Sequence, residues 1–129
     1  MGATQSMNQY IDTSKVYMDK SETCGGLGVF AKQDISKDEV VEVGLMAKLQ
    51  NVDGNENPHL FTWSDDRKTW AIASGCLPWY NHSDEPNVKK VGDLENDTMK
   101  IVALRDIKKG EELRNTYMSK EWRTCFKDF

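Results

Sequence analysis

The chain has 129 residues, of which 38% are hydrophobic and 29% are charged, and its net charge is −4 at pH 7. This length corresponds to one domain, and this composition excludes an intrinsically disordered chain. The negative net charge argues against direct binding of nucleic acid, and the absence of an apolar run of about 20 residues argues against a membrane-spanning helix.

The cysteines suggest a reducing compartment. Cys24, Cys76 and Cys125 are odd in number and widely spaced, which fits neither a disulfide framework nor a zinc site. Free thiols are typical of intracellular proteins, and the first residues lack the pattern of a secretory signal. We therefore expect an intracellular protein, in the cytoplasm or, if the source is eukaryotic or viral, in the nucleus.

The predicted elements are short and mostly extended. Residues 1–13 are polar and predict a flexible N-terminal segment, which is followed by a strand at 15–19. Glycines lead into a strand that ends at 31, and a run rich in β-branched residues predicts a strand at 40–49. Further strands are predicted at 59–63, 69–74 and the end of 93–104, with a loop at 51–58 and a helical turn at 119–126 capped by Ser119. Many short strands without a strand–helix–strand rhythm predict a mainly β fold.

One pattern occurs twice. Residues 29–41 and 101–113 both read as a strand, an alanine, and then Asp-Ile-x-Lys-x-Glu before an aliphatic residue. The repeat predicts a strand, a polar turn and a returning strand at each place.

Glycine and polar residues supply the first candidate sites. Gly26-Leu27-Gly28 can cradle an anionic or zwitterionic ligand through backbone amides, although a plain tight turn explains it as well. It lacks the third glycine and the following helix of a dinucleotide-binding loop.

His82 lies beside Ser83, Asp84 and Glu85, which raises the alternatives of a metal site and a catalytic triad. Consecutive residues of a strand or turn point in different directions, and His59 is the only other histidine. We therefore expect no metal site, and a polar turn explains the segment; a metal-dependent hydrolase is the weaker alternative.

The remaining candidates are ambiguous taken singly. Glu111 and Glu112 suggest acid–base work, but adjacent strand residues face opposite sides, so a solvated turn edge is the preferred interpretation. Tyr117 alone suggests a core residue. The other aromatic residues fit either core packing or a slot for a cationic group; they are Phe61, Trp63, Trp70, Trp79, Tyr80 and Trp122.

The order of these segments is more specific than any one of them. Gly-Leu-Gly at 26–28, Asn-His-Ser-Asp-Glu-Pro-Asn at 81–87, Gly-Glu-Glu-Leu at 110–113 and then Tyr117 resemble the SET-domain protein lysine methyltransferases. The resemblance covers roughly residues 15–122, within a SET domain at 14–129 whose C-terminal end forms a short lid. The segments "LFTW" and "WYNHSDEPN" look most like the short stand-alone SET proteins of bacteria and viruses.

The resemblance implies a β-clip-like fold of small curved sheets with little helix, in which the C-terminal segment threads beneath a loop. It implies S-adenosylmethionine as the cofactor on one face and a lysine of a protein substrate in a narrow channel on the other. The implied cofactor-binding residues are Gly26, Leu27, Gly28, Tyr80, Asn81, His82 and Trp122. The implied channel residues are Phe61, Trp63, Tyr80 and Tyr117, of which Tyr117 is catalytic.

The sequence departs from the family pattern at Gly25, Asp84 and Thr116, where basic, Cys and Asp residues are frequent, and it has no zinc-binding cysteine tail. The usual second channel tyrosine is also missing, and Tyr80 is the nearest substitute. These departures keep open the alternative of a SET-like binding module without turnover. The small size also suggests a homodimer in which a second copy completes the substrate groove.

Overall fold

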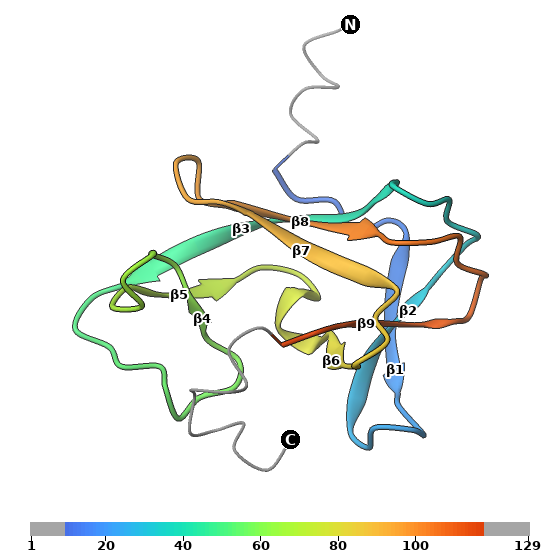
Figure 1. Ribbon diagram of the computed structural model, residues 1–129, viewed down its shortest axis with the longest axis horizontal. Helices are drawn as coiled ribbons and strands as arrows, with labels where there is room; N and C mark the ends of the chain where they lie inside the picture. Colours follow the sequence, from blue (N-terminus) through green and yellow to red (C-terminus); the bar gives the residue numbers. More distant parts are fainter. Residues whose placement is uncertain (1–9, 118–129) are drawn as a thin grey trace, which may run out of the picture.

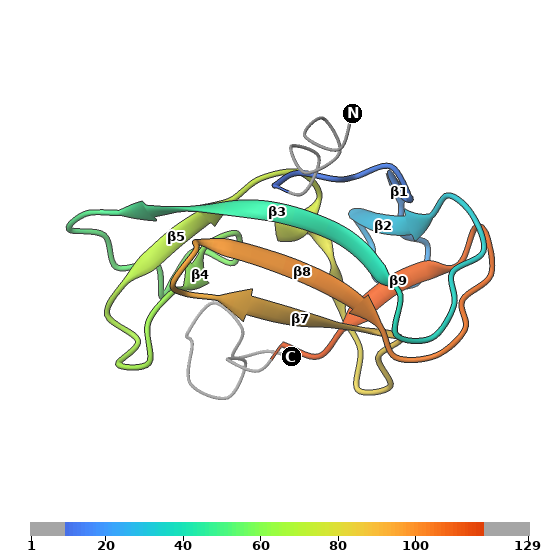
Figure 2. The ribbon, with the colours of Figure 1, turned by 90° about the horizontal axis from the view of Figure 1, so that it is seen from above.

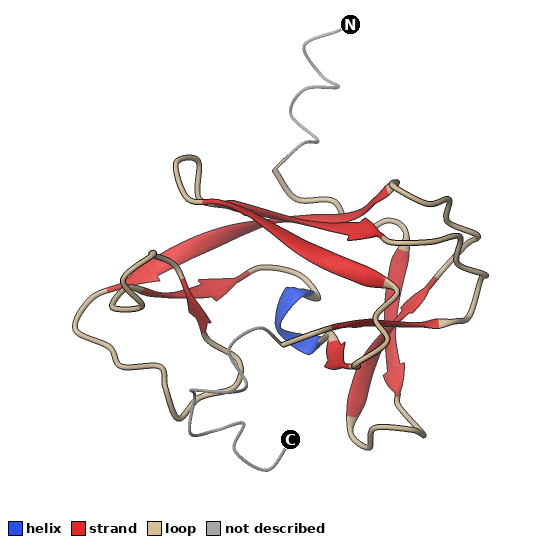
Figure 3. Cartoon of the chain, in the orientation of Figure 1, coloured by secondary structure: helices blue, strands red, loops and turns tan. Residues whose placement is uncertain are grey.

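The computed structural model describes residues 10–117, in which the regular secondary structure is almost entirely strand and long loops join the strands (Figure 3). Within this range the elements are β1 (Val16–Lys20), β2 (Leu27–Ala31), β3 (Val40–Leu49), β4 (Phe61–Thr62), β5 (Trp70–Ala73), the 3₁₀ helix η2 (Leu77–Trp79), β6 (Asn81–His82), β7 (Val88–Asp93), β8 (Thr98–Ala103) and β9 (Glu112–Asn115). The prediction of a mainly β fold with little helix is confirmed.

The strands form two sheets. The larger has the order β4-β5-β3-β8-β7 and curls like a half-barrel (Figure 2), and the smaller has the order β1-β2-β9-β6. All strand pairs are antiparallel except β6 with β9, which run parallel. Because β9 lies between β2 and β6, the smaller sheet joins the glycine segment, the Asn-His-Ser segment and the Gly-Glu-Glu-Leu segment, although they are far apart in sequence (Figure 1).

The repeated segments do not return on themselves as simple hairpins. Instead the strand before each turn pairs with the strand after the other turn, so that β2 pairs with β9 and β3 with β8. Ile35 and Ile107 form a two-way backbone bridge between the turns, with both N···O distances at 2.8 Å. The Asp34 carboxylate accepts the Lys109 N–H, and the Asp106 carboxylate accepts the Lys37 N–H. The two repeated segments are therefore related by approximate symmetry, and the reciprocal hydrogen bonds between them join the two sheets.

Several predicted elements differ in extent. The predicted strand at 59–63 shortens to β4, and β7 was not predicted, because its lysines and glycine weaken the strand pattern. The helix η2 also escaped prediction, since three residues give too little periodicity. Asp12, in the predicted N-terminal segment, exchanges two backbone hydrogen bonds with Val43. The predicted helical turn at 119–126 lies outside the described residues.

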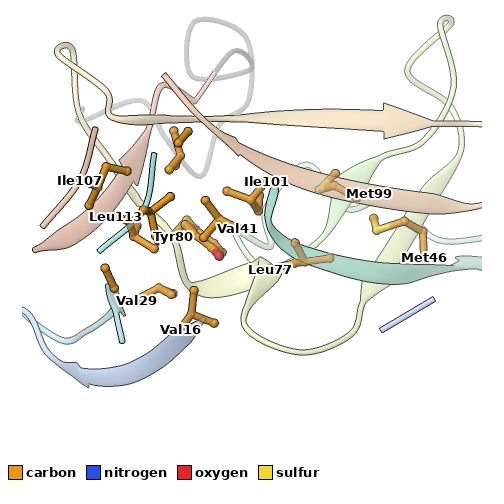
Figure 4. Packing of buried hydrophobic residues seen from close by; sticks show 14 of the residues in the cluster. Val16, Val29, Val41, Met46, Leu77, Tyr80, Met99, Ile101, Ile107 and Leu113 are labelled. Carbon is orange, nitrogen blue, oxygen red and sulfur yellow. The ribbon is translucent and has the colours of Figure 1, made fainter. Parts of the chain in front are cut away.

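The hydrophobic core fills the space between the two sheets (Figure 4). β1 and β2 contribute Val16 and Val29, the larger sheet contributes Val41 and Ile101, and the η2 segment contributes Leu77 from between the sheets. This core fixes the positions of the short strands β6 and β9, which carry most of the candidate site. Among the described residues, no helix has the length and apolar character needed to cross a membrane.

Candidate active site

The Asn-His-Ser segment lies directly against the segment that leads to Tyr117. β6 pairs with β9 in parallel register, with Asn81 opposite Arg114 and His82 opposite Asn115. Beyond the strands, the Thr116 hydroxyl donates a hydrogen bond of 2.7 Å to the Ser83 carbonyl. The two polar motifs that the sequence presents separately are thus one structural unit.

Asn87, the last residue of the motif at 81–87, joins the two segments through hydrogen bonds from its side chain to the backbone of β9. Its side-chain N–H donates to the Glu112 carbonyl at 2.8 Å, and its side-chain oxygen accepts the Arg114 N–H at 2.8 Å. The residue is buried, so these bonds are protected from water. Asn87 therefore has a structural reason for its place in the motif.

The glycine segment meets Asn81 and Glu112 at the start of β2. Gly26 has a φ of 66°, in the left-handed region that favours glycine. The Asn81 side-chain amide donates to the Leu27 carbonyl at 3.0 Å and to Glu112 Oε2 at 2.8 Å. A Cβ at Gly28 would collide with Glu112 Oε2 and lie 3.0 Å from Asn81 Nδ2. The absence of a side chain at Gly28 therefore lets the Glu112 and Asn81 side chains pack directly against the start of β2, an arrangement that we call the glycine cradle.

Glu112 is the ionic centre of this cradle. Its side chain is only 8% exposed, and Arg114 Nη2 donates to its Oε1 at 2.7 Å. The Ser21 hydroxyl donates to the same oxygen at 2.8 Å. Burial alone would raise the pKa of the Glu112 carboxyl, but the hydrogen bonds from Arg114, Asn81 and Ser21 outweigh burial and lower the pKa. The carboxylate therefore stays ionised, and the preferred interpretation of Glu112 as part of a solvated turn edge was wrong.

The two glutamates do face opposite sides of β9, as strand alternation predicts. Glu111 lies at the surface and pairs with Arg105 at 3.1 Å, while Glu112 turns inward. What the sequence could not decide was which of the two faces the site, because that depends on β9 lying between β2 and β6.

His82 is oriented by two hydrogen bonds. Its Nδ1 accepts the Tyr117 N–H at 2.9 Å, so the neutral ring carries its proton on Nε2, which donates to Asp84 Oδ1 at 2.9 Å. The His82 and Tyr117 rings also meet edge to face, with centroids 5.2 Å apart. His82 therefore supports the backbone at Tyr117, and Asp84 orients His82. Within residues 10–117, no cluster of three or more His, Cys, Asp or Glu residues is arranged to hold a metal ion.

Tyr117 presents a protonated hydroxyl. The hydroxyl donates a 2.7 Å hydrogen bond to the Tyr80 carbonyl, which brings two oxygen atoms together. Burial, together with the nearby Cys24 and Glu112 groups, raises the pKa of Tyr117 to about 12. At neutral pH this side chain is therefore a hydrogen-bond donor and not an anion.

A cavity of about 500 Å³ adjoins Tyr117. Its wall is mainly apolar and includes Leu60, Phe61, Pro78, Val88 and Leu104. The Lys90 ammonium lies over the Phe61 ring at 4.4 Å and 5.7 Å from the centre of the Tyr117 ring. Asn115 also lines the cavity, and its buried Oδ1 has no hydrogen-bond partner among the described residues.

Not every predicted site residue points to this region. The Tyr80 side chain is 1% exposed and enters the core, where its hydroxyl donates to Glu42 Oε1 at 2.7 Å, so only its carbonyl reaches Tyr117. Trp63 is also buried, and its Nε1–H donates to Asp97 at 2.8 Å. Trp122 lies outside the described residues. Six predicted positions meet in one unit, Gly26, Leu27, Gly28, Asn81, His82 and Tyr117, and Phe61 lines the adjoining cavity.

The sequence also left functional candidates unrecognised. Arg114 holds Glu112, and its buried Nε has no hydrogen-bond partner among the described residues. Glu42 is a buried carboxylate that accepts from Tyr80 and from the Cys76 N–H, and burial raises its pKa despite these bonds. An acidic residue inside the apolar run 40–49 was the available signal for Glu42.

Comparison with known proteins agrees with this arrangement. A family model described as "SET domain" matches residues 26–118. Histone-lysine N-methyltransferase, H3 lysine-37 specific, of Schizosaccharomyces pombe is 27% identical over 104 residues, which cover 75% of this chain and 69% of that protein.

Solved structures are similar as well. That of a candidate histone methyltransferase of Plasmodium falciparum is 30% identical with a TM-score of 0.65, covering 80% of this chain and 92% of that one. A structure of Polycomb Repressive Complex 2 from Chaetomium thermophilum, bound to S-adenosylmethionine, is 25% identical with a TM-score of 0.67 over 84% of this chain, but the match spans only 16% of that chain. All three sources are eukaryotic, so these comparisons give no support to the expected likeness to bacterial and viral proteins.

Proposed function

The chain belongs to the SET-domain family, and from this premise we propose that it transfers a methyl group from S-adenosylmethionine to the side-chain amine of a lysine in a protein substrate. The observation that carries the proposal is the position of Tyr117. Its N–H binds His82 beside the glycine cradle, its hydroxyl meets the Tyr80 carbonyl, and its ring lines the apolar cavity. Tyr117 therefore lies between polar residues that suit a cofactor and an apolar cavity that suits an alkyl amine.

The residues of the cradle fit the amino-acid end of S-adenosylmethionine, which carries an ammonium and a carboxylate. The Glu112 carboxylate and the Arg114 Nε, which has no hydrogen-bond partner among the described residues, are the features that support this fit. We assign the backbone of Gly26, Leu27 and Gly28 and the side chain of Asn81 to cofactor binding, with Glu112 as the anionic group nearest the cradle. When bound, the cofactor supplies an electrophilic methyl group on a sulfonium.

The chain itself must provide a neutral, aligned amine. The pKa of free lysine is about 10.4, and desolvation in an apolar cavity lowers the pKa of an amine. Phe61 and Tyr117 line that cavity, and the proton of the amine passes to solvent before the methyl group moves. The Tyr117 hydroxyl and the Tyr80 carbonyl then hold and orient the polar atoms at the inner end.

No carboxylate is needed as a general base in this proposal. Glu112 is already committed to three donors, and Glu42 is committed to Tyr80 and Cys76 in the core. The histidine is likewise occupied on both nitrogen atoms. The enzyme therefore works mainly by binding and alignment.

The names of the similar proteins indicate a class of protein substrate. Two of the similar proteins carry names that refer to histone methyltransferases, so histones are the first candidates, with an intracellular location that is nuclear if the source is eukaryotic. The alternative of a binding module without turnover predicts cofactor binding without transfer.

Two measurements test the proposal. Calorimetry should detect binding of S-adenosylmethionine, and an absence of binding at millimolar cofactor would reject both the enzyme and the binding module. Incubation with radiolabelled cofactor and a lysate should then label lysines of a protein, as located by mass spectrometry. Cofactor binding with no labelling of histones, of lysate proteins or of the chain would favour the binding module.

A further inference from the structure

We propose that Glu42 is a positioning residue: its buried carboxylate holds the backbone so that the Tyr80 carbonyl meets the Tyr117 hydroxyl. This inference rests on the proposed function, in which these two oxygen atoms orient the acceptor amine. Glu42 is not among the residues that line the cavity beside Tyr117. It lies on β3 with 1% of its surface exposed, so it acts on the site through Tyr80.

The Glu42 carboxylate binds both ends of the segment 76–80. Its Oε2 accepts the Cys76 N–H at 2.9 Å, at the residue that precedes the 3₁₀ helix η2. Its Oε1 accepts the Tyr80 hydroxyl at 2.7 Å, at the residue that follows the helix. A 3₁₀ helix of three residues gains little stability from its own hydrogen bonds. The two bonds to Glu42 therefore fix the direction in which the chain leaves η2.

The chain around η2 is packed closely on β3. Gly44 follows Glu42 on the same face of this strand, and a Cβ at Gly44 would collide with the Leu77 side chain. The Ser74 hydroxyl accepts the Leu45 N–H at 2.9 Å, and the Ser74 N–H donates to the Leu45 carbonyl at 3.0 Å. β3 therefore supports the chain before η2 and at η2, and the carboxylate adds the attachment beyond it.

A buried carboxylate is energetically unfavourable at this position. Burial raises the pKa of Glu42 despite the hydrogen bonds from Tyr80 and Cys76, because loss of water disfavours the ionised form. The neighbouring core is mainly apolar, and a well-packed apolar side chain is often at least as stabilising as a buried charge. Two directional hydrogen bonds are what an apolar side chain would not supply, so they account for an acidic residue here.

The last contact in this series lies at the proposed site. The Tyr117 hydroxyl donates to the Tyr80 carbonyl at 2.7 Å. Because the ring and the carbonyl of Tyr80 belong to one residue, release of the ring from Glu42 changes the position of the carbonyl as well. A displacement of about 1 Å can lower the rate of an enzyme by about a hundredfold. The effect of Glu42 should therefore appear in kcat.

Three variants separate positioning from acid–base chemistry and from general destabilisation. Glu42→Met removes both acceptor oxygens and should lower kcat at least about tenfold, with KM for the cofactor within about twofold of wild type. Glu42→Gln should keep kcat within about threefold of wild type. Its oxygen can accept the Cys76 N–H while its NH₂ group donates to the Tyr80 hydroxyl, which can accept as well as donate. Ile107→Val, a core change at the bridge between the repeated turns, should keep kcat near that of wild type.

Two kinetic results would overturn the inference. One is a wild-type kcat in Glu42→Met. The other is an equal loss in Glu42→Gln and Glu42→Met, because it would assign the role of Glu42 to its charge or its proton and not to its two hydrogen bonds.

The carbonyl can also be observed without turnover. Tyr80-Asn81 is the only Tyr-Asn pair in the sequence, so labelling of tyrosine carbonyls with ¹³C and of asparagine with ¹⁵N gives one HNCO signal for the Tyr80 carbonyl. Tyr117→Phe removes the donor to this carbonyl and should shift the signal in an otherwise wild-type chain. In Glu42→Met the added Tyr117→Phe change should shift it by less than about half as much, whereas Glu42→Gln and Ile107→Val should respond like wild type. An equal response in Glu42→Met, or none in wild type, would overturn the inference.

A further variant keeps the test decisive if Glu42→Met does not fold by circular dichroism. Tyr80→Phe then replaces it in both experiments, because it removes the hydroxyl and leaves the Cys76 bond in place. Its carbonyl is labelled through phenylalanine, since the sequence contains no Phe-Asn pair. The same thresholds apply to it.

The outcome can be separated from that of the proposed function. A weakened carbonyl response in Glu42→Met without methyl transfer by the wild-type protein would reject the proposed function and retain the role of Glu42 in placing the carbonyl. Methyl transfer at the same kcat in wild type and Glu42→Met would retain the proposed function and reject only the inference about Glu42.

Discussion

Replacing Glu112 with glutamine should destabilise the protein far more than the same replacement at Glu111. Glu112 receives three hydrogen bonds, two on Oε1 from Ser21 and Arg114 and one on Oε2 from Asn81. A glutamine has only one acceptor oxygen at this end, and its NH₂ group must face a donor in either orientation. The better orientation keeps the two bonds on Oε1 and loses the bond from Asn81.

The size of the effect follows from these contacts. Loss of one bond within a buried cluster costs about 1–1.5 kcal/mol, and removal of the negative charge weakens the bond from Arg114 by about 1 kcal/mol. The expected loss in the free energy of unfolding is therefore about 2–3 kcal/mol, or about 10 °C in Tm for a chain of this length. Glu111→Gln removes only the surface pair with Arg105, which is worth at most about 1 kcal/mol.

Urea unfolding at several pH values is the assay. The folded-state pKa of Glu112 lies below its usual value of 4.5, so its stabilisation is complete above pH 4.5 and is lost as the pH falls through the folded-state pKa. The gap between wild type and Glu112→Gln should therefore persist at neutral pH and narrow in acid. A loss below about 0.5 kcal/mol at neutral pH, or one no larger than that of Glu111→Gln, would refute the reasoning.

Three further predictions concern other parts of the site and core. Tyr80→Phe removes the hydroxyl donor from the buried Glu42 carboxylate and should cost about 1–3 kcal/mol in urea unfolding, whereas a change within error would show that Glu42 does not depend on it. Gly28→Ala should leave the chain folded by circular dichroism but lower the affinity for S-adenosylmethionine at least about tenfold in calorimetry, because its Cβ would displace the Glu112 and Asn81 side chains; unchanged affinity would place the cofactor elsewhere. Burial raises the pKa of the Cys76 thiol to about 11, so iodoacetamide should alkylate it more slowly than the exposed Cys24 at about pH 8, and equal rates in peptide mapping would contradict this.

Local sequence patterns predicted the strands whose residues have a high intrinsic preference for extended backbone. The β-branched run at 40–49 became β3 with the same bounds, and the mainly β class followed from many short strands. The resemblance to SET domains, which the order of the motifs carries, also implied that the Asn-His-Ser segment lies against the segment that leads to Tyr117, and the structure has them side by side. No single motif predicted this contact.

Side-chain direction was harder to predict, because it depends on partners that are distant in sequence. Tyr80 follows the short helix η2, and its ring turns into the core while its carbonyl faces Tyr117. Trp63 likewise turns toward Asp97, 34 residues further along the chain. No local signal distinguishes these orientations from ones that line the channel.

The same limit applies to charged residues. Glu112 and Arg114 gain their importance from Ser21 and Asn81, which approach only when β9 lies between β2 and β6. Lys90 appeared as an ordinary lysine until the curl of the larger sheet brought β7 opposite Phe61 on β4. Residues that belong to a sequence motif could be identified from the sequence. Residues that gain their contacts only in the tertiary fold could not.

We propose that Tyr117 links the cofactor-binding residues to the lysine cavity, and the most direct test is the rate of methyl transfer at saturating cofactor in wild type and Tyr117→Phe. The variant keeps the ring that lines the cavity but loses the hydroxyl that meets the Tyr80 carbonyl. We predict a fall in rate of at least about a hundredfold, with cofactor affinity nearly unchanged. A variant that turns over at the wild-type rate would contradict the account.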